Sequence, residues 1–107
     1  MRTIERTSRF KRDYKRESRG RHREYLDAIL AEVVDALAND RPLEPRHHDH
    51  ALSGEWQDFR DCHLRPDLLL IYQKPGTDVL RLARLGSHSA LGLCRSPELA
   101  PKRQPRG

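Results

Sequence analysis

The chain has 107 residues, of which 36% are hydrophobic and 35% charged, and its net charge is +5. This length predicts one domain with a single modest core beneath a densely charged surface. No apolar run approaches the roughly 18–20 residues that span a bilayer, and the N-terminus lacks the apolar segment of a secretory signal, so we expect no membrane association. The two cysteines, Cys62 and Cys94, are too few for a small secreted domain and predict reduced thiols in a cytoplasmic protein.

The positive charge is concentrated at the two ends of the chain. Residues 1–23 hold ten Lys/Arg and three acidic residues, whereas residues 24–94 hold seven basic and twelve acidic residues. A basic N-terminal element on a near-neutral body suits a polyanion such as RNA, although a solvated helix face explains the same pattern equally well. The candidate RNA- or ribosome-binding residues are Lys11, Arg12, Lys15, Arg16 and Arg19.

The N-terminal part of the chain predicts one strand and two helices. Thr3–Thr7 alternates like a short strand, Ser8 is a plausible N-cap for a helix over Arg9–Arg19, and Gly20 ends that helix. A second helix is expected over Arg23–Ala38, where a broad apolar face repeats at helical spacing: Tyr25, Leu26, Ile29, Leu30, Val33, Val34 and Leu37.

A long polar loop over Arg41–Glu55 precedes three predicted strands, Trp56–Leu64, Asp67–Gln73 and Asp78–Leu85. The middle strand is apolar on both faces, as expected at the centre of a sheet. The order β-α-α-β-β-β predicts an α+β fold in which two helices cover one face of an antiparallel sheet and leave the other face open. The Pro- and Arg-rich residues 95–107 are expected to be a disordered tail on a domain spanning residues 1–94.

Several polar side chains are expected to converge on the open face of the sheet. Asp61 and His63 lie two residues apart on one strand and share that face, whereas Cys62 points into the core. Asp67 begins the next strand, close to His63. Arg84 near the end of the last strand, His88 beyond it and His50 in the long loop complete the set.

This inventory fits RNA cleavage without a metal, in which the 2′-OH attacks the adjacent phosphorus. The reaction needs a base for the 2′ proton, an acid for the 5′-oxygen and positive charge on the phosphate. Histidine suits the two proton-transfer roles because its pKa lies near working pH, and arginine binds phosphate with a fixed charge. By periodicity alone, scattered surface polar residues explain the same set, and more simply.

Three other features have competing readings. The run His47-His48-Asp49-His50 has metal-ligand side chains, but no second ligand pair or recognised zinc spacing accompanies it, so a polar loop is the preferred reading. Trp56 could stack on a base, but is expected to anchor the core. Cys62 has no basic neighbour on its own face and is expected to pack rather than react.

Five segments resemble the YafQ-type branch of the RelE/ParE toxin superfamily. The similarity spans about residues 1–94, and two of its segments are specific to that branch. The segments are Asp49-His50-Ala51-Leu52-Ser53-Gly54-Glu55-Trp56, Phe59-Arg60-Asp61-Cys62-His63, Pro66-Asp67, Leu70-Ile71-Tyr72 and Gly86-Ser87-His88-Ser89-Ala90-Leu91.

The resemblance implies a RelE-like fold and a ribosome-dependent endoribonuclease that cuts mRNA in the ribosomal A site and is held inactive by a cognate antitoxin. By the same resemblance His50 or His63 is the base, His88 the acid and Arg84 the phosphate ligand, with Asp61 and Asp67 as orienting carboxylates. No metal or cofactor is implied.

One departure from the family pattern keeps other functions open. Relatives carry an aromatic residue four positions after the last histidine, where this chain has Gly92. A ParE-like inhibitor of DNA gyrase is the alternative from another class, although such proteins lack this His/Asp set. A toxin homologue with weakened catalysis is the third possibility.

Overall fold

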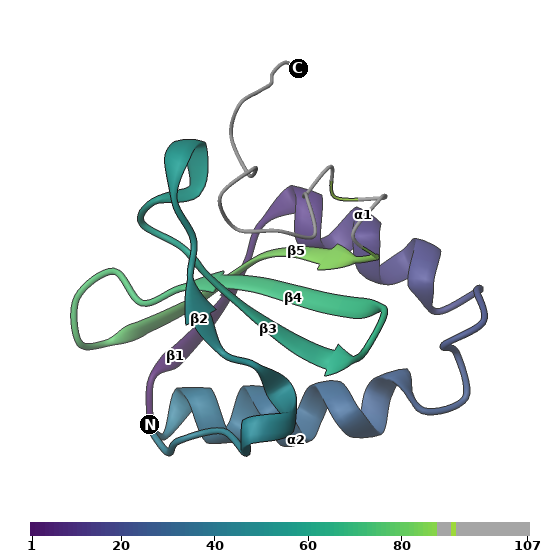
Figure 1. Ribbon diagram of the computed structural model, residues 1–107, viewed down its shortest axis with the longest axis horizontal. Helices are drawn as coiled ribbons and strands as arrows, with labels where there is room; N and C mark the ends of the chain where they lie inside the picture. The colour runs from purple at the N-terminus through teal and green to yellow at the C-terminus, as the bar shows by residue number, and fades with distance from the viewer. Residues whose placement is uncertain (88–90, 92–107) are drawn as a thin grey trace.

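The structure, a computed structural model, describes residues 1–87 and 91 as a five-stranded sheet with two helices packed against it (Figure 1). The strands follow the order β1-β5-β4-β3-β2, in which β1 is parallel to β5 and the other pairs are antiparallel. The predicted α+β fold is confirmed, with one parallel pair and one extra strand. The elements are β1 (Thr3–Arg6), α1 (Ser8–Glu17), α2 (Leu26–Ala38), β2 (His50–Ala51), β3 (Arg60–Arg65), β4 (Leu68–Gln73) and β5 (Val79–Gly86), with short 3₁₀ turns η1 (Pro45–His47) and η2 (Gly54–Trp56).

Both helices begin at positions other than those predicted. The N-cap of α1 is Thr7 instead of Ser8, because the Thr7 hydroxyl accepts a hydrogen bond from the Phe10 amide at 3.0 Å. α2 begins three residues late, since the chain before it makes three-residue turns: the Arg23 amide bonds to Gly20 O and the Tyr25 amide to His22 O. These tight turns delay the first helical hydrogen bond, from the Ile29 amide to Tyr25 O.

The main core lies between the helices and one face of the sheet. α2 contributes its predicted apolar face, and α1 contributes Phe10. All of β4 except Gln73 is buried, which confirms it as the central strand. Cys62 is fully buried on this face, as predicted; burial, followed by the nearby charges of Asp49 and Asp61, raises the pKa of its thiol. The thiol therefore stays protonated and packs as an apolar group.

The opposite face of the sheet is not bare, contrary to the prediction. Leu69, Ile71, Ala83 and Leu91 form a second small cluster on it. Leu52 and the rings of Trp56 and Phe59, whose centroids are 5.2 Å apart, pack against that cluster. The prediction that a strand starts at Trp56 is wrong. The chain forms the η2 turn there, which packs the Trp56 and Phe59 rings against the cluster, and β3 starts only at Arg60.

α1 covers the stretch of β5 that extends beyond β1. The Thr7 hydroxyl donates to Ala83 O at 3.0 Å, and the Asp13 carboxylate accepts from the Leu85 amide at 3.0 Å. Arg16 donates to Leu85 O at 2.9 Å. Side chains of α1 thus take the place of a further strand, which satisfies backbone groups that would otherwise be exposed.

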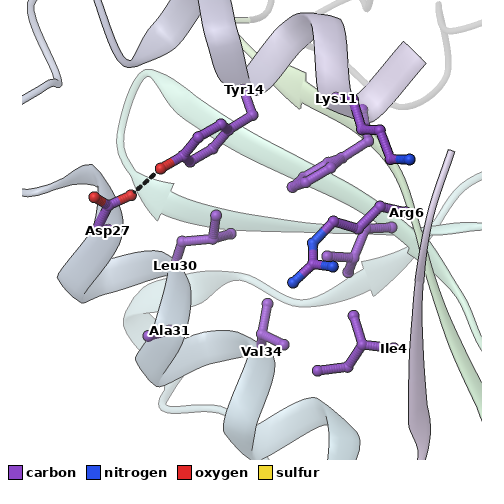
Figure 2. A pocket seen from close by; sticks show the side chains of 10 residues that line it. Ile4, Arg6, Lys11, Tyr14, Asp27, Leu30, Ala31 and Val34 are labelled. Carbon is purple, nitrogen blue, oxygen red and sulfur yellow. Dashed lines mark hydrogen bonds between the residues drawn. The ribbon is translucent and has the colours of Figure 1, made fainter. Parts of the chain in front are cut away.

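The two helices also touch each other directly. The Tyr14 hydroxyl of α1 donates a hydrogen bond to the Asp27 carboxylate of α2, above a groove of about 420 Å³ between the helices and β1 (Figure 2). Ile4, Leu30 and Val34 line the groove. Neither helix in the described part of the chain is long and apolar enough to cross a membrane.

Candidate active site

Four strands place one residue each in a row across the second face of the sheet. His50 pairs with Asp61, Asp61 with Ile71, and Ile71 with Arg84. Residues paired in this way share a face and are separated by about 4.8 Å per strand, so the row from His50 to Arg84 spans roughly 14 Å. The structure therefore brings three of the predicted site residues onto one face.

The histidine end of this row has a defined hydrogen-bond geometry. His50 Nδ1 lies 2.7 Å from His48 O, and because a carbonyl only accepts, Nδ1 carries the proton. His50 Nε2 lies 3.7 Å from Asp61 Oδ2. Asp61 is 4% exposed, so water screens its carboxylate little. A proton bound at His50 Nε2 would therefore be attracted strongly to this carboxylate.

His63 lies beside this pair on β3 and is partly buried. Its ring centroid is 5.3 Å from that of His48, with the two planes at 57°. His48 and His63 therefore form a pair of imidazoles next to the pair of His50 and Asp61. His48 was not predicted as a site residue, because its position follows from the η1 turn and from its own left-handed backbone, which no periodicity of the sequence reveals.

Arg84 is held at the other end of the row by a buried carboxylate. Its Nε lies 2.7 Å from Asp13 Oδ2 and its Nη2 3.2 Å from Asp13 Oδ1, which leaves Nη1 for another ligand. Burial raises the pKa of Asp13, but hydrogen bonds from Arg84 and the Leu85 amide, with the charges of Arg84 and Arg16, outweigh it and lower the pKa below its ordinary value of 3.8. The sequence did not identify Asp13, because its partners lie about 70 residues away.

Two further predicted residues have different outcomes. Asp67 lies in the turn before β4, is about half exposed and forms an ion pair with Arg21. That pairing holds it against the connection between the helices. His88 lies outside the described residues, so its predicted role stays a prediction.

The five cations predicted to bind RNA or the ribosome are exposed on α1 and just after it: Lys11, Arg12, Lys15, Arg16 and Arg19. Arg16 differs from the others because it also bonds to Asp13 and to Leu85 O. Within residues 1–87 and 91, no three His, Cys, Asp or Glu side chains are grouped so as to hold a metal ion. The side chains of His47 and Asp49 turn away from the row that His50 joins, so the run does not converge on one point.

Residues 2–92 match a family described as the bacterial toxin of type II toxin–antitoxin systems, YafQ. The chain belongs to the YafQ toxin family. An mRNA interferase toxin YafQ of Escherichia coli K12 is 36% identical over 91 residues, which cover 85% of this chain and 96% of that one. A YafQ toxin of Haemophilus influenzae is 44% identical over 64 residues, which cover 57% of this chain and 63% of that one.

Solved structures of YafQ-like toxins share the fold. A metal-bound toxin from Helicobacter pylori matches with a TM-score of 0.73 and 45% identity, over 85% of this chain and 99% of that one. The E. coli DinJ–YafQ complex matches with a TM-score of 0.68 and 33% identity, over 85% of this chain and 98% of that one. This chain is therefore a type II toxin by family, with the helices and sheet of YafQ structures.

Proposed function

We propose that this toxin is an endoribonuclease that cuts mRNA on the ribosome by attack of the 2′-OH on the adjacent phosphorus. The observation that carries the proposal is the row from His50 through Asp61 to Arg84, with His63 beside it. The names of curated relatives, which are mRNA interferases, support the same activity.

The row places a candidate base and a candidate phosphate ligand on one face of the sheet, with their backbones roughly 14 Å apart. His50 or His63 accepts the 2′ proton while the 2′-oxygen bonds to phosphorus, and His88 gives a proton to the departing 5′-oxygen. Because His50 donates through Nδ1, its Nε2 is the atom that takes the proton, and the Asp61 carboxylate stabilises the resulting cation. Asp67 is assigned no step here, because its carboxylate is paired with Arg21 at the connection between the helices.

Arg84 would bind the scissile phosphate through the Nη1 that its bond to Asp13 leaves available. A guanidinium already fixed by a carboxylate needs little reorganisation when charge develops on the phosphate oxygens. Every group this reaction requires is then a protein side chain, so no metal takes part in the step.

The cognate partner would be an antitoxin protein, as DinJ is for E. coli YafQ in the complexes. The cations of α1 would contact ribosomal RNA, and the site of action would be the cytoplasm, where translating ribosomes are found. The alternative function is inhibition of DNA gyrase, as in ParE-like proteins. That function would make no use of the histidine row.

The test uses purified toxin, translating ribosomes and a reporter mRNA, with cuts mapped by primer extension. We expect cuts in frame that leave a 2′,3′-cyclic phosphate and a 5′-OH, and no cut where a single 2′-deoxynucleotide replaces the scissile residue. His50→Ala and His63→Ala should each lower the rate by about 10²-fold or more. Intact mRNA together with blocked gyrase supercoiling would instead support the ParE-like function.

A further inference from the structure

The run from His47 to His50, here called the histidine segment, is anchored through its odd-numbered members. His47 is 3% exposed and donates from Nδ1 to His63 O at 2.6 Å. Asp49 accepts from the Tyr72 hydroxyl at 2.6 Å and from Arg60 Nε at 3.3 Å. The even-numbered members, His48 and His50, are the ones beside His63 and Asp61.

We infer that Asp49, held by Tyr72 and Arg60, is a positioning residue that sets where the His48 and His50 rings lie for cleavage. The kinetic part of this inference rests on the proposed function. Asp49 itself points away from the row, so it acts through its two neighbours in the chain and not on the RNA.

Beyond η1, in which the His47 and His48 amides bond to Glu44 O and Pro45 O, backbone pairing of the histidine segment is short. β2 pairs with β3 through only two residues, His50 and Ala51. His48 has a φ of 47°, a left-handed conformation that L-residues adopt at a cost and that persists where surrounding contacts impose it. The side-chain anchors on either side of His48 supply those contacts.

Tyr72 gives the Asp49 carboxylate a rigid hydrogen-bond donor. It lies on the central strand β4, is 1% exposed and packs in the main core. Burial, followed by the hydrogen bond to Asp49, raises the pKa of its hydroxyl, so the group remains a donor at all physiological pH values. Arg60 approaches the same carboxylate oxygen from β3, opposite Tyr72 in the sheet register.

The decisive variant is Tyr72→Phe, which removes one hydroxyl and keeps the ring in the core. A displacement of the His50 ring by about 1 Å costs up to 10²-fold in rate, so kcat for ribosome-bound mRNA should fall about 10- to 100-fold with KM within about twofold. Asp49→Asn, which keeps an acceptor oxygen, should lose less activity than Asp49→Ala.

The matched control is Tyr14→Phe, because Tyr14 also donates its hydroxyl to an aspartate on another element, Asp27. We expect Tyr14→Phe to lower the thermal midpoint less than Tyr72→Phe, because its hydrogen bond is exposed, and we expect only Tyr72→Phe to lower kcat at temperatures well below both midpoints. The imidazole ¹H–¹³C resonances of His48 and His50 should shift in Tyr72→Phe and stay in place in Tyr14→Phe.

Unchanged kcat and unchanged His48 and His50 resonances in Tyr72→Phe would overturn the inference. So would an equal fall in kcat in both Phe variants, since general destabilisation would then explain it. If the wild-type protein cleaves no mRNA on ribosomes, the proposed function fails, and the resonance comparison still decides whether Asp49 positions the two rings.

Discussion

Asp13 is an acidic residue in a strongly basic helix, and its surroundings explain why it is there. It is 3% exposed and lies between the guanidinium of Arg84 and the amide of Leu85, with Arg16 one turn further along α1. A partly buried arginine without a counter-charge would be costly. Asp13 therefore neutralises Arg84 and joins α1 to β5 at the same point.

We expect Asp13→Ala to lower the free energy of unfolding by about 1–3 kcal/mol, because it leaves a partly buried charge and a buried backbone amide without a partner. Urea denaturation at pH 7 measures this loss. Glu24→Ala, at an exposed position before α2, is the control and should change stability by less than about 0.5 kcal/mol.

A comparison of the wild-type protein with Asp13→Ala at several pH values tests the lowered pKa of Asp13. A carboxyl whose pKa is depressed on folding stabilises the protein fully above its unfolded pKa and loses that effect as the pH falls through the folded value. The difference in stability between wild type and Asp13→Ala should therefore be constant from pH 7 down to about 5 and shrink only below the ordinary value of 3.8. A difference that already shrinks between pH 7 and 5 would contradict the ion pair.

The sequence predicted correctly those site residues whose placement follows from the alternation of side chains along a strand. Asp61 and His63 share a face because strand side chains alternate, and the apolar run of β4 shows that this strand is central. The sequence could not show that Asp13 meets Arg84 or that Asp49 meets Tyr72, since these contacts join segments 71 and 23 residues apart. Local periodicity carries no information about such pairs.

At the scale of elements, the success of each secondary-structure prediction depended on the number of residues in the helix or strand. The helices and the three longer strands have enough residues to repeat a pattern, and all were found, with ends that moved by a few residues. β2 has two residues, too few for any period, and was missed. The start of β3 was misplaced because Trp56 and Phe59 bury their rings from a turn instead of a strand.

α1 also carries the charge that we expect the ribosome to recognise. Replacing Lys11, Arg12 and Lys15 together by Gln should weaken ribosome binding and reduce the slope of log affinity against log salt by about 2–3, because each phosphate contact releases counterions. Co-sedimentation over a range of salt concentrations measures both quantities. The fold should not change, since these side chains are exposed.

The Arg16→Gln variant should be measured beside the triple variant, because Arg16 has a structural contact as well as a charge. Arg16 bonds to Asp13 and to Leu85 O, so its loss should lower the unfolding free energy as well as the affinity. A triple variant that binds ribosomes with the wild-type salt slope would show that the basic face of α1 serves only solubility.

At the scale of the whole molecule, the prediction of a basic tail over residues 95–107 on a domain spanning residues 1–94 concerns residues outside the described part of the chain. We propose to test this division by truncation. A variant ending at Cys94 should keep the urea midpoint and circular dichroism spectrum of the full chain. A lower midpoint would mean that the tail packs on the domain.

The way α1 lies along β5 has a consequence for behaviour in concentrated solution. Sheets that expose long unpaired strands can add strands from other copies and grow into fibres. In the described part of this chain, the outermost strands are only four and two residues long, and the remainder of β5 already bonds to helix side chains. A second folded molecule finds little free backbone here with which to extend the sheet, so pairing between the sheet edges of folded copies is restricted.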